Sequence, residues 1–304
     1  MAHFGRLLTA MVTPFTESGA VDFAKAAELA KNLVAAGNDG LVITGTTGEG
    51  PTLSEDEKLE LYRVTKRAVG SASIVAGTGN YNTAESIHLS REAERCGVDG
   101  LLLVVPYYNN PPQEGLYQHF KAIAGATSLP CILYNVPPRS PRNLEASTLR
   151  RLAEIDNIVA VKEASGKLEQ FNAVIGAVPD DFLVFSGNDS DTHTIMSLGG
   201  YGVVSVSSHL VAGQTKRMVE LLAAGRTAEA ATIHHKLLPL VEALFWQPNP
   251  MPVKAVLNLL GFQVGKPRLP LLDLTDAEKD RLRAVLDRYA SDLDGYLTKQ
   301  LVAA

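Results

Sequence analysis

The sequence predicts an α/β protein: a closed, parallel (β/α)8 barrel with a C-terminal helical extension. Short apolar, β-like runs recur at intervals of roughly 25–40 residues, with helical patterns between them, and there are eight such runs. The runs are continuous rather than alternating, which is typical of strands buried on both faces. We expect the barrel, with the active site, in residues 1–225 and the helical extension in residues 226–304.

Each expected strand is a short apolar segment followed by turn-forming or polar residues. The strands are expected at 7–12, 40–44, 73–77, 100–105, 131–135, 158–161, 182–187 and 202–206. The sixth strand, Ile158-Val159-Ala160-Val161, has Lys162 at its end, where the chain is expected to open into a loop.

The segments between the strands carry helical periodicity and helix-terminating residues. Asp22 is a favourable N-cap for the first helix, Gly37 ends it, and Ser54-Glu55-Asp56-Glu57 forms a capping box for the second. The barrel helices are expected at 22–36, 54–69, 82–97, 114–126, 145–155, 168–178, 189–198 and 212–224. Three further helices are expected in the extension, at 228–245, 252–260 and 276–297.

Composition excludes several classes of protein. The net charge is -5, so no basic surface for nucleic acid is expected, and no apolar run approaches the length of a membrane span. The first residues lack the regions of a signal peptide, and two cysteines, Cys96 and Cys131, cannot form a disulfide framework. We therefore expect a cytoplasmic protein with reduced thiols.

No Cys or His pair has zinc-ligand spacing, and His234-His235 are expected to be structural or solvated, so no metal is predicted.

In a parallel barrel the catalytic groups lie in the loops after the strand C-termini. By this rule, one amine, hydroxyl groups of two kinds and one guanidinium are expected together at the same end of the barrel. The candidates are Thr46, Thr47, Glu49, Tyr107, Tyr108, Tyr134, Arg139, Lys162, Gly187, Asn188, Val204 and Ser205. A neutral, desolvated lysine amine attacks carbonyl carbon to form a Schiff base. The set therefore favours a carbonyl-processing site over a phosphate or metal site.

Each candidate also has a structural interpretation. Lys162 could end its strand and pair with Glu163 in solvent, and Arg139 could be an ordinary surface residue, although two preceding prolines suit a fixed carboxylate-binding fork. The Gly45–Gly50 turn lacks the Gly-Lys-Ser/Thr ending of a phosphate loop, so its amides and threonines could hold a small carboxylate instead. Glu49 is expected to be a structural hydrogen-bond partner. The tyrosines could be core or interface aromatics.

Several motifs, in this order, resemble the dihydrodipicolinate synthase family of pyruvate-dependent lyases, which is related to N-acetylneuraminate lyase. They are Gly45-Thr46-Thr47-Gly48-Glu49, Pro106-Tyr107-Tyr108-Asn109, Gly115–Phe120, Tyr134-Asn135-Val136-Pro137-Pro138-Arg139, Val161-Lys162-Glu163-Ala164, Ser186-Gly187-Asn188-Asp189 and Pro248–Lys254. The resemblance covers essentially the whole chain. It implies condensation of pyruvate with L-aspartate 4-semialdehyde to 4-hydroxy-tetrahydrodipicolinate, in lysine and diaminopimelate biosynthesis.

The resemblance also implies a role for each matching residue. Lys162 forms the Schiff base with pyruvate, and Tyr134 passes protons in a hydroxyl relay completed by Thr46 and Tyr108. Thr47 holds the pyruvate carboxylate, with Val204 and Gly187 among the substrate-binding residues, and Arg139 binds the carboxylate of the semialdehyde. In the family, the tyrosine that matches Tyr107 reaches across a tight dimer interface, and the neighbouring position, Tyr108, lies close to that interface. A homotetramer, built as a dimer of dimers, and a reaction without metal or organic cofactor are implied as well.

Two features bear on which member of the family this is. Related sialic-acid lyases usually have Ser-Thr-Gly-Glu and an apolar residue at the position of Arg139, so Thr46 and Arg139 favour the synthase over a lyase for N-acetylneuraminate or 2-keto-3-deoxy sugar acids. A barrel that binds small acids without turnover is a third alternative, which the intact reacting set opposes. Lysine-sensitive relatives bind lysine at positions matching Gly50, Pro51, Glu55, Lys58, Tyr81, Glu85 and Tyr107. Sensitive relatives often have His at the Glu55 and Lys58 positions and Asn at the Tyr81 position. A cation at Lys58 should disfavour a cationic effector, so weak or absent inhibition by lysine is predicted.

Overall fold

The computed structural model describes residues 4–297 and confirms the predicted fold class, a closed barrel of eight parallel strands. Strands neighbour one another in sequence order, and β8 closes the barrel by pairing with β1. The strands are β1 (Leu7–Ala10), β2 (Gly40–Ile43), β3 (Ser73–Gly77), β4 (Gly100–Val104), β5 (Cys131–Asn135), β6 (Ile158–Glu163), β7 (Leu183–Ser186) and β8 (Gly202–Ser205).

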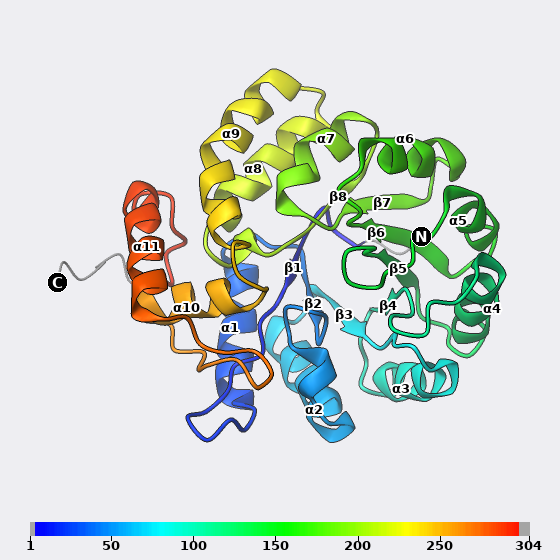
Figure 1. Cartoon of the computed structure of the whole chain (residues 1–304), viewed down its shortest axis with the longest axis horizontal. Helices are drawn as coiled ribbons and strands as arrows, with labels where there is room; N and C mark the ends of the chain where they lie inside the picture. The colour runs from blue at the N-terminus through cyan, green and yellow to red at the C-terminus, as the bar shows by residue number, and fades with distance from the viewer. Residues whose placement is uncertain (1–3, 298–304) are drawn as a thin grey trace.

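Helices surround the strands and form the outer layer of the molecule (Figure 1). Those of the barrel are α1 (Phe23–Ala35), α2 (Glu55–Val69), α3 (Thr83–Arg95), α4 (Gln113–Ala124), α5 (Ala146–Leu152), α6 (Leu168–Ala177), α7 (Thr192–Ser197) and α8 (Ala212–Ala223). The extension adds α9 (Thr227–Ala243), α10 (Met251–Leu259) and α11 (Asp276–Leu286), and Figure 1 shows α10 and α11 together on one side of the barrel, near α1.

The predicted caps explain where two helices begin. The Asp22 carboxylate accepts from the backbone N–H of Lys25 at the start of α1. At α2, Ser54 and Glu57 form the expected capping box, each side chain accepting from the other residue's backbone N–H. Such caps satisfy backbone donors that have no partner within the helix.

An outer and an inner apolar layer follow from the alternation of side chains along the strands. The outer layer, between the sheet and the helices, consists of two clusters, and a third cluster fills the barrel interior. In β6, Val161 belongs to the outer core whereas Ala160 and Ala164 belong to the interior. The two-residue period therefore directs Lys162, which lies between these alanines, into the barrel.

Strand β6 is longer than the sequence pattern suggested. It continues through Lys162 to Glu163, because the pairing with β5 and β7 continues as well: Tyr134 pairs with Lys162, and Glu163 pairs with Ser186. Lys162 is thus held within the sheet rather than at the start of a loop, and flanking strands restrain its backbone on both sides.

The prediction of one helix over 276–297 is wrong at its C-terminal end. Helix α11 stops at Leu286, and the chain continues through a short 3₁₀ turn into irregular structure. The physical reason lies in Asp294, whose carboxylate accepts from the backbone N–H of Ala212 (2.9 Å) and Gly213 (3.4 Å) at the start of α8. The segment after α11 therefore caps another helix. The last part of the predicted extension, 298–304, lies outside the described residues.

Within residues 4–297, no helix combines the length and the apolar character needed to cross a membrane. The two cysteines, Cys96 and Cys131, are both free thiols.

A buried histidine predicts how stability depends on pH. His209 is fully buried, its Nε2 accepts from the Val12 N–H (3.2 Å), and its Nδ1 donates to the Val206 carbonyl oxygen (2.9 Å). Burial lowers the pKa of His209 from 6.5 to about 4. At a pH between these two values, His209 is therefore protonated in the unfolded chain and neutral in the folded chain. The contribution of neutral His209 to the free energy of unfolding is complete above about pH 6.5 and is lost as pH falls through about 4.

We expect the free energy of unfolding to fall by about 3 kcal/mol on account of His209 over this interval. Thermal or urea unfolding of wild type and His209→Gln across the same pH range checks this. The variant, which cannot titrate, should be less stable at neutral pH but should show a shallower decline in acid. Equal declines in both proteins would show that His209 does not control this titration.

Candidate active site

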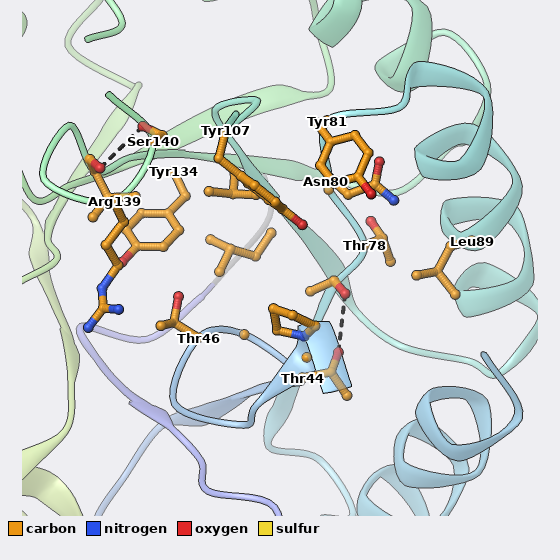
Figure 2. Close-up of a pocket in the computed structure, with 18 of the residues that line it drawn as sticks. Thr44, Thr46, Thr78, Asn80, Tyr81, Leu89, Tyr107, Tyr134, Arg139 and Ser140 are labelled. Carbon is orange, nitrogen blue, oxygen red and sulfur yellow. Dashed lines mark hydrogen bonds between the residues drawn. The ribbon is translucent and has the colours of Figure 1, made fainter. Parts of the chain in front are cut away.

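A cavity of about 520 Å³ opens at the C-terminal ends of β2, β3, β4 and β5. Figure 2 shows Tyr107 lying across it, with Tyr81 on one side and Tyr134, Arg139 and Thr46 on the other. This is the end of the barrel where strand order and the loop rule placed the site. Of the predicted site residues, Thr46, Tyr107, Tyr134 and Arg139 line the cavity.

Lys162 and Tyr134 lie side by side on neighbouring strands. Their backbones are paired in the ladder between β5 and β6, and Lys162 Nζ is 4.1 Å from the centre of the Tyr134 ring. Both residues are 6% exposed. Tyr134 lines the cavity and Lys162 does not, so Lys162 adjoins the cavity through its contact with Tyr134.

Glu163 is not the partner of Lys162. Its carboxylate accepts from Asn135 Nδ2 (2.9 Å), from the backbone N–H of Ser165 (2.7 Å) and from Gln170 Nε2 (3.4 Å), on the outer side of the sheet. Burial raises the pKa of Glu163, against these hydrogen bonds. The interpretation that Lys162 and Glu163 form a solvated pair is therefore wrong. Lys162 instead has its amine over the ring of Tyr134.

Gly187 provides space for the lysine side chain. A Cβ atom at this position would lie 3.1 Å from Lys162 Cγ and 2.7 Å from Ala164 Cβ. The Gly187 N–H also donates to the Glu163 carbonyl oxygen (2.7 Å), which holds the backbone close to β6. Val204, on β8, is 1% exposed and belongs to the same interior core as Tyr134. Both residues lie in or beside the barrel interior and not on the cavity wall.

The loop after β2 carries the two threonines. Thr46 lines the cavity, whereas Thr47 is buried and its hydroxyl oxygen accepts from Asn249 Nδ2 over 2.8 Å. Glu49 is buried and its carboxylate is paired with Lys254 Nζ at 2.8 Å, which confirms that Glu49 is structural. Lys254 is the second buried lysine of this region, but Glu49 and two carbonyl oxygens bind its ammonium. Lys162 is the better candidate nucleophile.

Arg139 lies on the cavity wall beyond β5, in a tight turn. The backbone N–H groups of Arg139 and Ser140 both donate to the Val136 carbonyl oxygen, at 2.8 and 3.0 Å. The side chain is exposed. The fixed turn and the accessible guanidinium match the carboxylate-binding role predicted from the two prolines.

The two tyrosines after β4 behave differently. Tyr107 is partly buried, and its ring meets that of Tyr81 edge-on at 5.1 Å. Burial raises the pKa of Tyr107. Tyr108 is 94% exposed, has a φ of +71°, and does not line the cavity. The chain therefore does not bring Tyr108 to its own Tyr134.

Most of the predicted effector positions line the same cavity as Tyr134. These are Gly50, Pro51, Lys58, Tyr81, Glu85 and Tyr107. Glu55 is the exception, because its carboxylate pairs with His88 Nε2 at 2.8 Å. Burial lowers the pKa of Lys58, opposed by the charges of Glu55 and Glu85. These predicted effector positions thus line the same cavity as the predicted catalytic residues Thr46 and Tyr134.

Several residues at this site were not predicted. Thr78, Gly79 and Asn80 line the cavity directly after β3, and applying the loop rule to the third strand would have found them. Thr44, Leu102, Val104, Val136 and Ser140 also line it. Asn249 had a signal in the sequence, because it belongs to the Pro248–Lys254 motif.

Comparison with known proteins agrees with this geometry. The model of the dihydrodipicolinate synthetase family matches residues 3–289. Proteins named 4-hydroxy-tetrahydrodipicolinate synthase from Moorella thermoacetica and Symbiobacterium thermophilum are 56% and 54% identical, over 93% and 94% of this chain and 98% of each relative. A crystal structure of the enzyme from Cyanidioschyzon merolae with lysine bound superimposes with a TM-score of 0.92 at 46% identity, covering 94% of this chain and 98% of that one. The chain therefore belongs to the dihydrodipicolinate synthetase family.

Proposed function

We propose that this chain is a lyase that condenses pyruvate with L-aspartate 4-semialdehyde to 4-hydroxy-tetrahydrodipicolinate, in lysine and diaminopimelate biosynthesis. The observation that carries the proposal is the buried Lys162 amine 4.1 Å from the ring of Tyr134, which lines a cavity together with Thr46 and Arg139. Relatives at 50–56% identity over nearly the full chain carry the name of this activity.

In the first stage, Lys162 attacks the C2 carbonyl of pyruvate. A carbinolamine forms, loses water and leaves an imine that is protonated on nitrogen. Both the departing hydroxyl and the imine nitrogen need protons at this stage. Tyr134, adjacent to Lys162, is placed to exchange them.

In the second stage, the imine withdraws electrons and makes the pyruvate methyl acidic. Loss of a proton gives an enamine, whose carbon attacks the aldehyde of the second substrate and forms the new C–C bond. The substrate amine then attacks the imine carbon, closes the ring and releases Lys162 as a free amine. One water is lost overall, and every step uses protons and side chains alone, so the proposed reaction needs no metal or organic cofactor.

The remaining residues are assigned to binding and proton transfer. Thr47, with Val204 and Gly187, holds pyruvate near Lys162, and Thr46 extends the relay from Tyr134. Tyr108 completes this relay from a neighbouring subunit, because its own side chain is 94% exposed and lies off its own cavity. The resemblance implies that Tyr107 reaches across the dimer interface, and within the chain its ring packs against that of Tyr81.

A homotetramer built as a dimer of dimers accommodates this arrangement. Exposed apolar side chains include Tyr81 and Tyr108 near the cavity, and Leu168 and Leu198 at the ends of α6 and α7; Phe245, Leu269 and Leu272 in the C-terminal extension are exposed as well. We place the protein in the cytoplasm, which fits its two free thiols. Sedimentation velocity tests the assembly, and a monomer with full activity would contradict the role of Tyr108 in a neighbouring subunit.

Substrate comparison tests the proposed function. Pyruvate should be consumed with aspartate semialdehyde, and N-acetylneuraminate and 2-keto-3-deoxy sugar acids should not be cleaved at comparable rates. Tyr134→Phe should slow the condensation while the fold is retained. Cleavage of a sugar acid with higher kcat/KM than the condensation would replace this proposal with a related pyruvate aldolase.

Arg139→Ala should affect the second substrate more than the first. The guanidinium is proposed to bind the semialdehyde carboxylate, and loss of a bidentate charged contact reduces binding by roughly 10- to 100-fold. We expect KM for aspartate semialdehyde to rise by this factor while KM for pyruvate changes little. Steady-state kinetics with each substrate varied in turn provides the measurement. Equal increases in both KM values would show that the role assigned to Arg139 is wrong.

Inhibition by lysine should be weak or absent. A lysine molecule would bring a second ammonium into a cavity where Lys58 is already partly desolvated, as its lowered pKa indicates. We expect activity to persist at millimolar lysine, and Lys58→His to increase sensitivity. Activity assays over a lysine titration check this. Strong inhibition of the wild-type protein at sub-millimolar lysine would refute the prediction.

A further inference from the structure

A buried hydrogen bond joins the C-terminal extension to the loop that carries Thr46 and Thr47. Asn249 Nδ2 donates to Thr47 Oγ1 over 2.8 Å, between residues 202 positions apart. Thr47 is 3% exposed and Asn249 is 8% exposed. Asn249 lies two residues before the start of α10, so a residue outside the barrel contacts the side chain proposed to hold the pyruvate carboxylate.

The direction of this hydrogen bond determines what Thr47 can do. A hydroxyl group has one proton to donate and two lone pairs that accept. Because the amide of Asn249 donates, it occupies a lone pair of Thr47 and leaves the hydroxyl proton available. A free proton is what the hydroxyl needs in order to bind a carboxylate.

The other end of the amide shows that this contact has a structural cost. Asn249 Oδ1 is buried and accepts no hydrogen bond within residues 4–297. An unpaired, buried acceptor destabilises a folded protein. A position selected only for packing would therefore favour an apolar side chain. The contact with Thr47 is the observation that accounts for the amide.

The backbone of the same loop is held at both ends in a conformation that non-glycine residues rarely adopt. Thr44 has a φ of +58° and Glu49 a φ of +56°. Thr44 Oγ1 lies 2.7 Å from the Tyr62 hydroxyl oxygen, and the Glu49 carboxylate accepts from Lys254 Nζ (2.8 Å) and from the Arg268 N–H (2.8 Å). These contacts fix the backbone, which leaves rotation about the Thr47 side chain to be fixed by Asn249.

We propose that Asn249 is a positioning residue for pyruvate binding, which orients the Thr47 hydroxyl so that its proton points to the substrate carboxylate. The C-terminal extension is then part of the active site, although it contributes no residue that touches the reacting atoms. This inference depends on the proposed function, since it takes Thr47 as the pyruvate-binding residue.

The first test is the effect of Asn249→Ala on the two Michaelis constants. We expect KM for pyruvate to rise about tenfold, the loss associated with one hydrogen bond to a charged group, while KM for aspartate semialdehyde changes less than about twofold. Asn258→Ala is the matched control. Asn258 lies on α10 and bonds to Gly265 and Val264, so its loss should lower thermal stability and leave both KM values unchanged.

The second test is a double-mutant cycle with Thr47→Val. If Asn249 acts through Thr47, the double variant should have the same KM for pyruvate as Thr47→Val alone. Independent, multiplicative effects would overturn the inference. If Asn249→Ala does not fold, Asn249→Asp replaces it, because its carboxylate can only accept and would occupy the Thr47 proton. An unchanged KM for pyruvate in whichever of these variants folds would also overturn the inference.

Wild-type trapping separates this inference from the function on which it rests. If borohydride fixes pyruvate to the wild-type protein but the Asn249 variants bind pyruvate normally, the inference fails and the proposed function stands. If the wild-type protein forms no adduct, the proposed function fails first.

Discussion

Lys162→Ala should reduce the rate of condensation to below roughly one thousandth of the wild-type rate, because it removes the amine proposed to form the imine on which each later step depends. Two other amines lie in this region: Lys58, which lines the cavity, and Lys254. Lys254 is buried and bound by Glu49 and by the carbonyl oxygens of Thr13 and Lys266. Its pKa is lowered to about 8, chiefly by burial, yet it does not line the cavity. Initial rates with both substrates at saturating concentration provide the measurement.

Lys162→Met is the matched control for folding. It removes the amine but retains the length of the side chain in the interior core around Ala160, Ala164 and Phe185. An apolar side chain should suit this environment, so we expect the thermal midpoint to be unchanged or higher while activity is lost. Substantial turnover by either variant would show that the imine forms elsewhere or that the reaction uses no imine.

Lys254→Met should have the largest effect on stability. Lys254 is 0% exposed and Glu49 is 3% exposed, and the substitution leaves the Glu49 carboxylate buried without its cation. Removing one partner of such a pair costs about 3–5 kcal/mol. For a chain of this size, we expect a decrease of roughly 10 °C in the thermal midpoint. Differential scanning calorimetry measures it.

The double variant Glu49→Gln/Lys254→Met distinguishes an unpaired charge from lost packing. Glutamine carries no charge and can still accept from the Arg268 N–H, so the double variant should be more stable than Lys254→Met alone. Activity should fall in Lys254→Met as well, because Glu49 ends the loop of Thr46 and Thr47. A thermal midpoint within a degree or so of wild type in Lys254→Met would contradict the assigned role of the pair.

The sequence predicted the barrel because each strand is a local, continuous apolar run. Strand order and the position of Lys162 beside Tyr134 then followed from the rules of parallel barrels. Local patterns failed where a long-range contact decided the structure. The segment after Leu286 has helical residues, but Asp294 caps α8 instead of continuing α11.

The site, like the fold, could be predicted where local sequence patterns determine it and not where long-range contacts do. Tyr134 lies near the end of β5, Thr46 and Arg139 lie in loops after strands, and all three line the cavity as expected. The contact between Asn249 and Thr47 spans 202 residues and has no local pattern, so the motif alone could mark Asn249 but could not give its partner. Tyr108 is exposed and has a left-handed backbone at φ +71°, and an apolar or helical period encodes neither property.

The most direct test of the central claim is borohydride reduction of the wild-type protein in the presence of pyruvate, followed by peptide mass spectrometry. The proposal predicts one adduct per chain, on Lys162, with the added mass of pyruvic acid less one oxygen atom, and no adduct in Lys162→Ala. An unmodified wild-type protein, or an adduct on another lysine such as Lys58 or Lys254, would contradict it.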